Sequence, residues 1–300
     1  MKHFNLIANR NIFLGISGAM MLASWFLVAT VGLKQGIDLR GGTQWEISFP
    51  SSTVSVEQIQ IAIAPLVQQS EHSVKQNESG SFTLRLPSMD EAGHANYRQV
   101  LSAIGTYSEN SFSSIGPTIG IELRNRAVRA VIAVLVGISL FIAYAFRKVS
   151  KPISSWKYGF ATLITLVHDV SIPMGLLAIL GWYKGIEIDT NFIVALLVVM
   201  GFSVHDTIVV FDRIRENILI HRGKGSSLAD IINHSVRETF ARSINTTLTL
   251  VIVLIALLVF GPSSLYYFIL TILVGTVFGT YSSIFLASPI LYIWANKSSR

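Results

Sequence analysis

Six long apolar runs constrain this chain more than any other feature of its sequence. Each run has about 20 residues, which in a helix is enough to cross the hydrocarbon core of a bilayer. The chain as a whole is 51% hydrophobic and only 13% charged, which is too apolar for a soluble globular protein. The sequence therefore predicts a polytopic α-helical membrane protein. The six predicted transmembrane helices cover about residues 11–33, 127–146, 158–181, 190–211, 244–261 and 265–294.

The distribution of basic residues predicts the orientation of these helices. With a cytoplasmic N-terminus, the inner segments would hold most of the 23 Lys and Arg residues, so the positive-inside rule favours N- and C-termini in the cytoplasm. The first run is too long for the apolar region of a signal peptide, and we expect it to be retained. The basic residues assigned to the inner side are Lys2, Arg10, Arg147, Lys148, Lys151, Lys157, Arg213, Arg215, Arg222, Lys224, Arg237, Arg242, Lys297 and Arg300.

The basic loop between the fourth and fifth runs, residues 212–243, is patterned as a short amphipathic helix, a turn at "GKG" (223–225) and a helix from Ser227. A cytoplasmic connector held at the lipid surface by its charges explains the net charge of +6 better than a nucleic-acid site does. We therefore expect membrane lipid, and not nucleic acid, as a partner. The chain has no cysteine, so it uses no disulfide or thiol chemistry.

One large hydrophilic region divides the chain into three predicted parts. Residues 1–33 form an N-terminal tail and the first transmembrane helix. Residues 34–123 are long enough to form a small α+β domain, which would lie outside the cytoplasm. Residues 124–300 form a five-helix transmembrane bundle with cytoplasmic loops and a C-terminal tail.

The pattern of the outer domain predicts a β-α-β-α-β order. Apolar and polar residues alternate in "TQWEISF" (43–49) and "SFTLRLP" (81–87), as in half-buried strands, and "NSFSSIGPT" (110–118) is a last extended piece. Capping-box spacings predict helices that start at Ser55, with Gln58, and at Ser88, with Glu91; Pro65 is expected to kink or shorten the first of these helices. Two isolated histidines, His72 and His94, are expected to be solvated, and no nucleophile or metal-ligand pattern is present.

Two aspartates lie inside the apolar runs. Asp169 follows His168 near the middle of the third run, and Asp206 follows His205 about six residues from the inner end of the fourth. An ionised carboxylate at the bilayer centre costs about 2.5 to 3.5 kcal/mol, so such groups usually line a protein interior or a water cavity. We favour a functional role for Asp206, with pairing to Arg213 on the same helix face as the alternative. For Asp169, function and helix packing against a threonine both remain open.

The fifth run supplies a partner for Asp206. Arg242, Asn245, Thr246 and Thr249 recur at helical spacing and form one polar stripe, which should face protein or water. Arg242 and Asp206 both lie near the inner ends of their helices, at a similar depth. A carboxylate that faces a guanidinium releases its proton more readily, and separation of the two reverses this effect. Such a pair, opened alternately to the two sides, would carry protons across the membrane.

The remaining features of the runs allow two interpretations each. His168 and His205 would either pass protons or pack as neutral hydrogen-bonded side chains, and Asn245 and Thr246 would likewise be relay or packing residues. A His-Asp metal site would need further ligands that the sequence does not supply. The sixth run has small residues at four-residue spacing, which permits close contact with another helix; these are Gly275, Gly279, Ser283 and Ala287.

Taken together in order and spacing, five segments resemble the SecF family of bacterial protein-export subunits, within the resistance-nodulation-division superfamily. The resemblance covers nearly the whole chain. Its carriers are "GIDLRGGTQ" (36–44), "SIGPTIGIELRNRAV" (114–128), "HDVSIPMGLLAILG" (168–181), "GFSVHDTIVVFDRIREN" (201–217) and "RETFARSINTTLTLVIVLIALLVFG" (237–261).

The resemblance implies a proton-driven accessory role in late steps of preprotein translocation across the bacterial cytoplasmic membrane. Asp206 would be a proton-relay residue and Arg242 its basic counterpart, and the periplasmic domain would bind the emerging preprotein. The implied partners are a SecD subunit, the SecYEG channel with SecA, and YajC and YidC in the wider assembly. No enzyme activity, metal or cofactor is expected, because the transmembrane proton gradient supplies the driving force.

Two departures from the family and three rival functions remain. The family usually has Asn where this chain has His205, and "LRGG" (39–42) resembles the SecD version of the motif, in a turn where glycines supply backbone freedom. An intramembrane aspartyl protease would use Asp169 and Asp206, but "FSVH" precedes Asp206 where a protease has a glycine motif. A half-size exporter would need larger outer domains, and a structural scaffold would use the charges only for packing.

Overall fold

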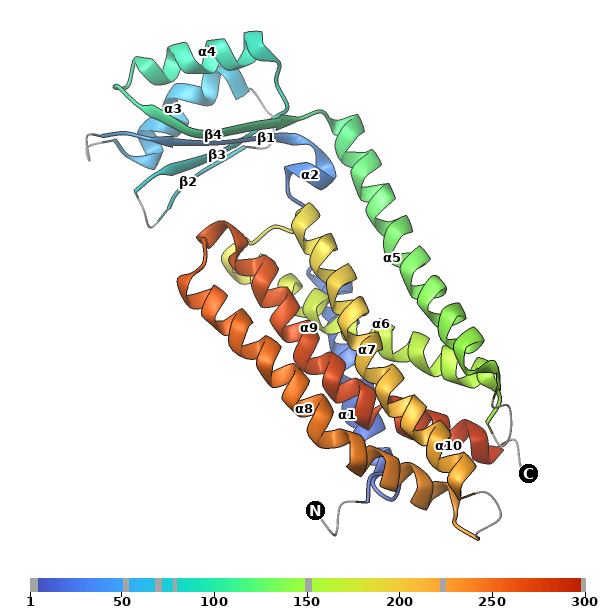
Figure 1. The fold of residues 1–300 in the computed structure, drawn as a ribbon. Coiled ribbons are helices and arrows are strands. Elements are labelled where there is room, and N and C mark those ends of the chain that lie inside the picture. The colour runs from blue at the N-terminus through green and yellow to red at the C-terminus, as the bar shows by residue number, and fades with distance from the viewer. Residues whose placement is uncertain are drawn as a thin grey trace. The chain divides into compact units, whose positions relative to one another are not determined.

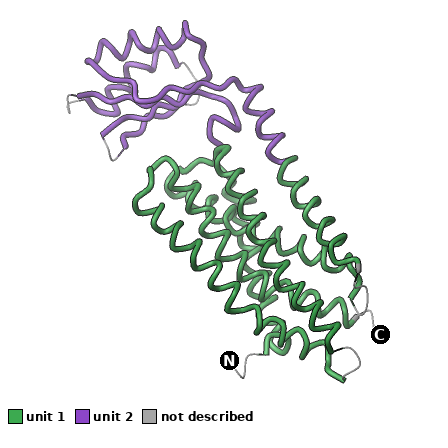
Figure 2. Tube along the Cα trace, in the orientation of Figure 1, with its two compact units in different colours: residues 1–34, 129–300 green, residues 35–128 purple. Residues whose placement is uncertain are grey.

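The computed structural model describes residues 5–50, 54–67, 72–77, 80–148, 153–221 and 225–297. These residues form two compact units: residues 35–128 are one, and the first 34 residues with residues 129–300 are the other (Figure 2). Six described helices are long and apolar enough to cross a membrane. In the sequence, the strands of a small four-stranded sheet come between the first and the second of these helices. The predicted fold class, a polytopic helical membrane protein with a small α+β domain, is confirmed.

The larger unit, called here the membrane unit, contains the helices of all six predicted runs (Figure 1). Helix α5 belongs to both units, since the boundary falls after residue 128. Two short 3₁₀ turns are also present: η1 (Phe146–Lys148) directly follows α5, and η2 (Ser263–Leu265) directly precedes α9. The long helices are α1 (Arg10–Thr30), α5 (Pro117–Ala145), α6 (Ser155–Lys184), α7 (Thr190–Ile220), α8 (Leu228–Phe260) and α9 (Tyr266–Phe285), with a shorter α10 (Ala287–Lys297).

Several helices extend beyond the predicted runs. Helix α5 starts at Pro117 rather than near residue 127, and α7 continues to Ile220 without the expected break after residue 211. Charged residues end an apolar run but not a helix, because Arg, Lys and Glu are good helix formers. The helix expected from Ser227 is confirmed, and the Ser227 hydroxyl accepts a hydrogen bond from the Asp230 N–H at its start.

The sixth run is not one helix, as expected, but two. Helix α9 ends at Phe285, Leu286 interrupts the helical pattern, and α10 begins at Ala287. Pro289 explains the break, because a proline has no N–H to donate to the carbonyl four residues earlier and its ring crowds that carbonyl. The carbonyl concerned belongs to Phe285, the last residue of α9.

Part of the predicted loops and tails lies outside the described residues. Of the "GKG" turn, only Gly225 is described, with a left-handed φ of 76°. The basic residues whose side chains are not described are Lys2, Lys148, Lys151, Arg222, Lys224, Lys297 and Arg300.

The smaller unit, called here the outer domain, is an antiparallel sheet with the strand order β2-β3-β1-β4. Helices α3 and α4 lie together on one face of this sheet (Figure 1). The predicted β-α-β-α-β order is wrong by one strand, since β2 precedes β3. Strand β2 is only four residues long and buries one side chain, Val74, so it gives no readable alternation. The elements are α2 (Ile37–Arg40), β1 (Gly42–Ser48), α3 (Val56–Val67), β2 (Ser73–Gln76), β3 (Phe82–Leu86), α4 (Glu91–Ser102) and β4 (Ser108–Ile115).

The two helix starts of the outer domain were predicted with different success. Ser55 and Gln58 form the expected capping box: the Ser55 N–H donates to Gln58 Oε1 at 2.9 Å and the Gln58 N–H to Ser55 Oγ at 3.3 Å. The cap predicted at Ser88 is wrong, because Asp90 caps α4 by accepting from the Gly93 N–H at 2.9 Å. Helix α3 continues through Pro65, which lies in its last turn.

His94 was expected to be solvated, and this expectation is wrong. Its side chain is buried, packed edge-on against Trp45 and stacked on Phe112 with ring centroids 3.9 Å apart. Glu109 lies 3.6 Å from its Nε2. The α4 pattern places His94 on the same face as Tyr97 and Leu101, which also face the core. His72 is exposed, as expected.

The glycine pair after α2 makes the sharp turn into β1. Gly41 and Gly42 have φ values of 85° and 126°, which side chains other than glycine rarely adopt. A Cβ on Gly41 would lie 2.7 Å from Pro117 Cα, and one on Gly120 would lie 2.4 Å from the Gly41 nitrogen. Two of the segments that carry the family resemblance therefore meet here, and the predicted backbone role of the glycines is confirmed.

Candidate functional site

Asp206 is buried in the membrane unit, where α7, α8 and α9 meet. Only 2% of its surface is exposed. Thr280 of α9 donates its hydroxyl hydrogen to Asp206 Oδ2 at 3.0 Å. Thr247 of α8 bonds in turn to the Thr280 hydroxyl. Hydroxyl groups from two neighbouring helices thus form a chain of hydrogen bonds that ends at this carboxylate.

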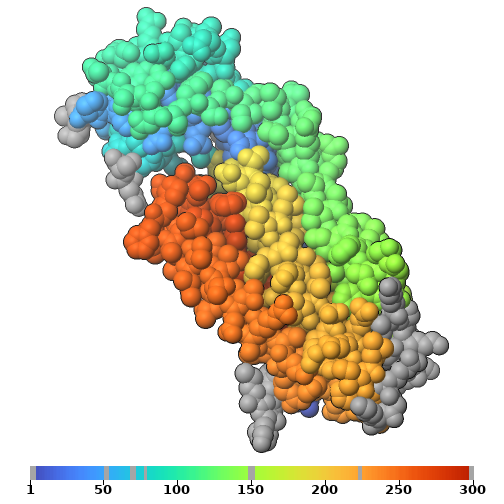
Figure 3. All heavy atoms as spheres, in the orientation of Figure 1, coloured from blue at the N-terminus to red at the C-terminus, as the bar shows by residue number. Residues whose placement is uncertain are grey.

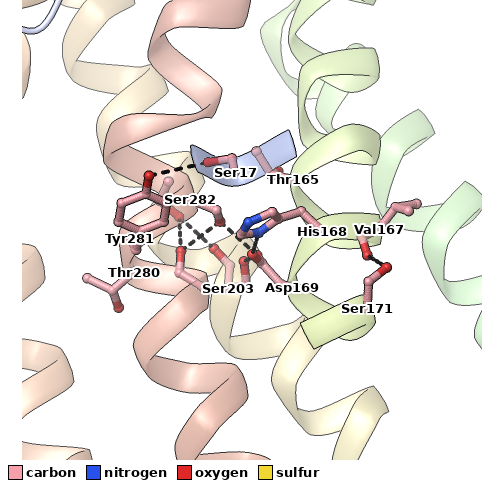
Figure 4. Close-up of polar contacts among 12 residues, drawn as sticks. Ser17, Thr165, Val167, His168, Asp169, Ser171, Ser203, Thr280, Tyr281 and Ser282 are labelled. Carbon is pink, nitrogen blue, oxygen red and sulfur yellow. Dashed lines mark hydrogen bonds and ion pairs between the residues drawn. The ribbon is translucent and has the colours of Figure 1, made fainter. Parts of the chain in front are cut away.

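Asp169 is buried in the middle of α6 and has three polar partners (Figure 4). Its Oδ1 contacts His168 Nδ1 at 2.9 Å. Its Oδ2 accepts hydrogen bonds from Ser282 of α9 at 2.8 Å and from Ser203 of α7. Buried polar groups are normally hydrogen-bonded, and both oxygens of this carboxylate have polar partners. The donors are two serines rather than the threonine considered from the sequence.

The close approach of α7 and α9 explains how these serines reach Asp169. A Cβ on Gly275 would lie 2.3 Å from Val199 Cγ2, and one on Gly279 would lie 3.0 Å from Ser203 Cβ. The first distance is possible only with glycine and the second leaves very little room for a side chain, so the predicted role of the small-residue stripe in close helix contact is confirmed at these two positions. The hydroxyls of Thr207 and Ser283 also bond across this interface, at 2.8 Å.

Arg242 does not contact Asp206. Its side chain lies on the exposed surface of the membrane unit, and no hydrogen bond or ion pair among the described residues joins the two side chains. Asn245 and Thr249 of the same stripe are also exposed, and Thr246 is half-buried. Helix α8 lies on the surface of the unit seen in Figure 3.

Arg213, the alternative partner for Asp206, is engaged elsewhere. Its guanidinium binds both oxygens of Glu238 on α8, at 2.7 and 2.8 Å, and also contacts Glu216. Asn217 donates to Glu238 at 2.8 Å. These contacts tie α7 to α8 beyond the apolar run. Asp206 therefore has no ion-pair partner in the described part of the chain.

The two "VHD" strings differ in their surroundings. His168 is buried with Asp169, whereas His205 is exposed beside the buried Asp206. The Nε2 atom of His168 is buried and has no hydrogen-bond partner among the described residues. Thr162 and Thr165, which lie about two turns and one turn before Asp169 on α6, are fully buried together with it.

The hydroxyl partners of both carboxylates were not identified from the sequence. The signal available was the run "TYSS" (280–283) in the middle of an apolar helix, of which only Ser283 was singled out, as a small residue. The partners that the sequence reasoning missed are Ser203, Thr247, Thr280 and Ser282.

The arrangement provides two separate carboxylates, each of which can bind a proton. Hydroxyl groups donate to an ionised carboxylate and accept from a protonated one, so both states can be hydrogen-bonded. In the described structure no hydrogen bond joins Asp169 to Asp206, whereas the two carboxylates of an aspartyl protease share one proton.

Comparisons with known proteins agree with these features. The family described as "Protein export membrane protein SecD/SecF, C-terminal" matches residues 96–297, and the "SecD/SecF GG Motif" matches residues 26–49. The protein translocase subunit SecF of Thermobaculum terrenum is 41% identical over 98% of this chain and 94% of its own length. The SecF of Anaerolinea thermophila is 36% identical over 99% of this chain and 96% of its own length.

A solved structure has the same fold over nearly the whole chain. The crystal structure of SecDF from Thermus thermophilus, described as a translocon-associated membrane protein, superposes with a TM-score of 0.83 at 30% identity. The match covers 98% of this chain but only 39% of the SecDF chain. The fold, the glycine turn and the full-length similarity lead to one conclusion: this chain belongs to the SecF family of protein translocase subunits.

Proposed function

We propose that this chain is the SecF-type subunit of a proton-driven complex that assists late steps of preprotein translocation through the Sec channel. The observation that carries the proposal is Asp206, a buried carboxylate held by hydroxyl groups and without an ion-pair partner among the described residues. An intramembrane carboxylate of this kind is typical of proton pathways.

Asp206 would alternate between a protonated and an ionised state. In the arrangement described here, Thr280 donates a hydrogen bond to the carboxylate, and the Arg242 guanidinium does not contact it. Movement of Arg242 toward Asp206 would favour release of the proton, and its withdrawal would favour uptake. Asp169 would act as a second relay residue, with His168 beside it. His205, Asn245 and Thr246 would line the approach to this site or pack against the partner.

The transmembrane proton gradient would supply the driving force, and no cofactor or catalytic step is required. Each elementary charge that crosses 100 mV releases about 2.3 kcal/mol. This energy is enough to shift an equilibrium between two conformations several tens of fold. We therefore assign the chain a transport role rather than an enzymatic one.

A SecD subunit would cover the exposed polar stripe of α8. Arg242, Asn245 and Thr249 lie on the surface of the membrane unit, and polar side chains on a membrane helix normally face protein or water. The 39% coverage of the SecDF chain supports a partner that supplies the rest of the assembly. The complex would act with the SecYEG channel and SecA, with YajC and YidC in the wider assembly.

The complex would lie in the bacterial cytoplasmic membrane. The N- and C-termini of this chain would be cytoplasmic, and the outer domain periplasmic, where it would bind the emerging preprotein. The excess of basic residues in the predicted inner segments supports this orientation.

The test is gradient-dependent secretion of a reporter preprotein by inverted vesicles that contain this chain with its SecD partner. We expect Asp206→Asn and Arg242→Met, at equal abundance in the vesicles, to remove the gradient-dependent part of secretion. The control is Asp212→Asn, which changes an exposed carboxylate on the same helix. Normal secretion by both test variants would contradict the proposal.

A further inference from the structure

One turn of α9 contacts four neighbouring helices. Successive residues of an α-helix point about 100° apart, so four hydroxyl residues in a row project in all directions. Thr280 reaches Asp206 of α7 and Thr247 of α8. The turn from Thr280 to Ser283, called here the hydroxyl turn, also contacts α1, α6 and again α7 through Tyr281, Ser282 and Ser283.

Both carboxylates accept hydrogen bonds from this hydroxyl turn. Thr280 donates to Asp206 at 3.0 Å, and Ser282, two residues later, donates to Asp169 at 2.8 Å. Figure 4 shows Thr280 and Ser282 on the same stretch of helix, with Ser282 directed to Asp169. Both bonds therefore start from one turn of α9, so that a displacement of this turn can act on both carboxylates.

Helix α7 makes a second link between the two carboxylates. Ser203 donates to Asp169 and lies one turn before Asp206 on α7. At this level α7 and α9 approach closely, since a Cβ added to Gly279 would lie 3.0 Å from Ser203 Cβ. Close-packed interiors transmit small displacements instead of absorbing them.

The inference concerns the residues that hold the two carboxylates, and it rests on the proposed proton-binding function of this site. We propose that Thr280 and Ser282 are positioning residues through which Asp169 and Asp206 are coupled, so that proton binding at one carboxylate changes the proton affinity of the other. Neither hydroxyl group takes up or releases the transported proton itself. Each fixes a carboxylate to the same rigid turn of α9.

Other titratable groups surround the pair and must be controlled for. His168 lies beside Asp169, and Tyr281 of α9 lies near His168 with ring centroids 6.3 Å apart. His205 precedes Asp206 on α7, and Arg242 lies on the neighbouring α8. None of these four side chains bonds to both carboxylates in the described structure, whereas α9 does so through Thr280 and Ser282.

The experiment is a pH titration of each carboxyl group by infrared difference spectroscopy, on the SecD-bound chain in lipid vesicles. The carboxyl band of each aspartate is identified by subtraction of the Asp169→Asn or Asp206→Asn spectrum. We expect Thr280→Val, which removes a partner of Asp206 only, to shift the midpoint of Asp169 by at least about 0.3 pH unit, a twofold change in proton affinity. Ser282→Ala should shift the midpoint of Asp206 by a similar amount.

The matched control is Thr271→Val. Thr271 lies on the same helix and is fully buried, and its hydroxyl, among the residues that the structure describes, bonds only to the Tyr267 carbonyl of its own helix, at 2.7 Å. It should shift neither midpoint, and Thr280→Ser should restore the midpoint of Asp169. The proposal is overturned if each variant moves only the carboxylate that it contacts, or if Thr271→Val moves both equally. If Thr280→Val fails to assemble, Ser282→Ala decides alone.

The two proposals fail in different ways. If Asp206→Asn abolishes gradient-dependent secretion while Ser282→Ala leaves the Asp206 midpoint unchanged, the proton role stands and the coupling is wrong. If the midpoints are coupled but Asp206→Asn secretes normally, the coupling is a property of packing and the proposed function is wrong.

Discussion

The outer domain and the membrane unit are built in opposite ways. The core of the outer domain is a cluster of apolar side chains around Trp45, Ile47 and Leu84, and the polar Gln44, Glu46 and Arg85 alternate with them at less buried positions of β1 and β3. In the membrane unit, the contacts between α6, α7 and α9 include Asp169, Ser203 and other polar groups that are almost fully buried. Its surface carries many large apolar side chains, such as Phe260, which is 87% exposed.

The contrast follows from the two solvents. In water, burial of apolar surface drives folding, so apolar side chains mark the interior. In lipid, apolar side chains gain little from burial, and membrane helices associate through small residues, close packing and hydrogen bonds. Glycine and hydroxyl side chains therefore mark the interior of the membrane unit.

The largest predicted effect tests the apolar core of the outer domain. Trp45 is fully buried between β3, β4 and His94, so Trp45→Ala should destabilise the domain by about 3 to 5 kcal/mol. Hydrogen exchange of β1 in the full-length chain measures this loss. Ile61→Ala, at a position that is 69% exposed on α3, is the control and should leave the exchange unchanged. Similar protection in both variants would contradict the assignment of the core.

A smaller effect tests the close packing of the membrane unit. Gly275→Leu should destabilise this unit by about 1 to 3 kcal/mol, because the added side chain overlaps Val199. Thermal unfolding in detergent measures the change. Gly137→Leu, on α5 where nothing lies within 4 Å of an added Cβ, is the matched control. Equal stability of the two variants would mean that α7 and α9 are not held together at Gly275.

Removal of a helix cap should have a still smaller effect. Asp90→Ala deletes the side chain that accepts from the Gly93 N–H and should cost the outer domain about 1 kcal/mol. Ser88→Ala, at the position first expected to be the cap, should cost less. Denaturant unfolding followed by hydrogen exchange of α4 ranks the two variants. If Ser88→Ala destabilised the outer domain more than Asp90→Ala does, Ser88 would be the cap, as the sequence pattern predicts.

The smallest effect is expected on the apolar surface of the membrane unit. Leu140→Ala on α5 should change stability by no more than about 0.5 kcal/mol, because Leu140 is 65% exposed. Ile142→Ala, two residues later and fully buried, is the comparison and should destabilise the unit clearly more. Thermal unfolding of the detergent-solubilised chain would distinguish them, and equal losses would show that the exposed face of α5 packs against protein.

Sequence reasoning succeeded where a pattern has one physical meaning. Twenty apolar residues in a row can only be buried or cross a membrane, and Ser55 with Gln58 specifies a helix start. It failed where the outcome depends on neighbours distant in sequence. Strand β2 exists because β3 pairs with it, and His94 is buried because Trp45 and Phe112 enclose it.

The candidate site was only partly predictable for the same reason. A charge in an apolar run is conspicuous, so both aspartates were found from the sequence. A hydroxyl in such a run is ambiguous, because it can bond to its own helix, as Thr162 does to the Tyr158 carbonyl, or to another helix, as Thr280 does. Which of the two occurs is decided by helix packing, and the approach of α7 to α9 at Gly279 depends on the whole bundle.

The lengths of α7 and α8 have a mechanical consequence. Helix α7 has 31 residues and α8 has 33, so α7 is about 46 Å long, whereas the hydrocarbon core is about 30 Å thick. The contacts of Arg213 and Asn217 with Glu238 join the two helices near the end that lies beyond Asp206. Ile220 lies about 21 Å along the axis from Asp206. A tilt of about 5° at the carboxylate would therefore move the far end of α7 by about 2 Å, and the joined helices would act as one stiff lever.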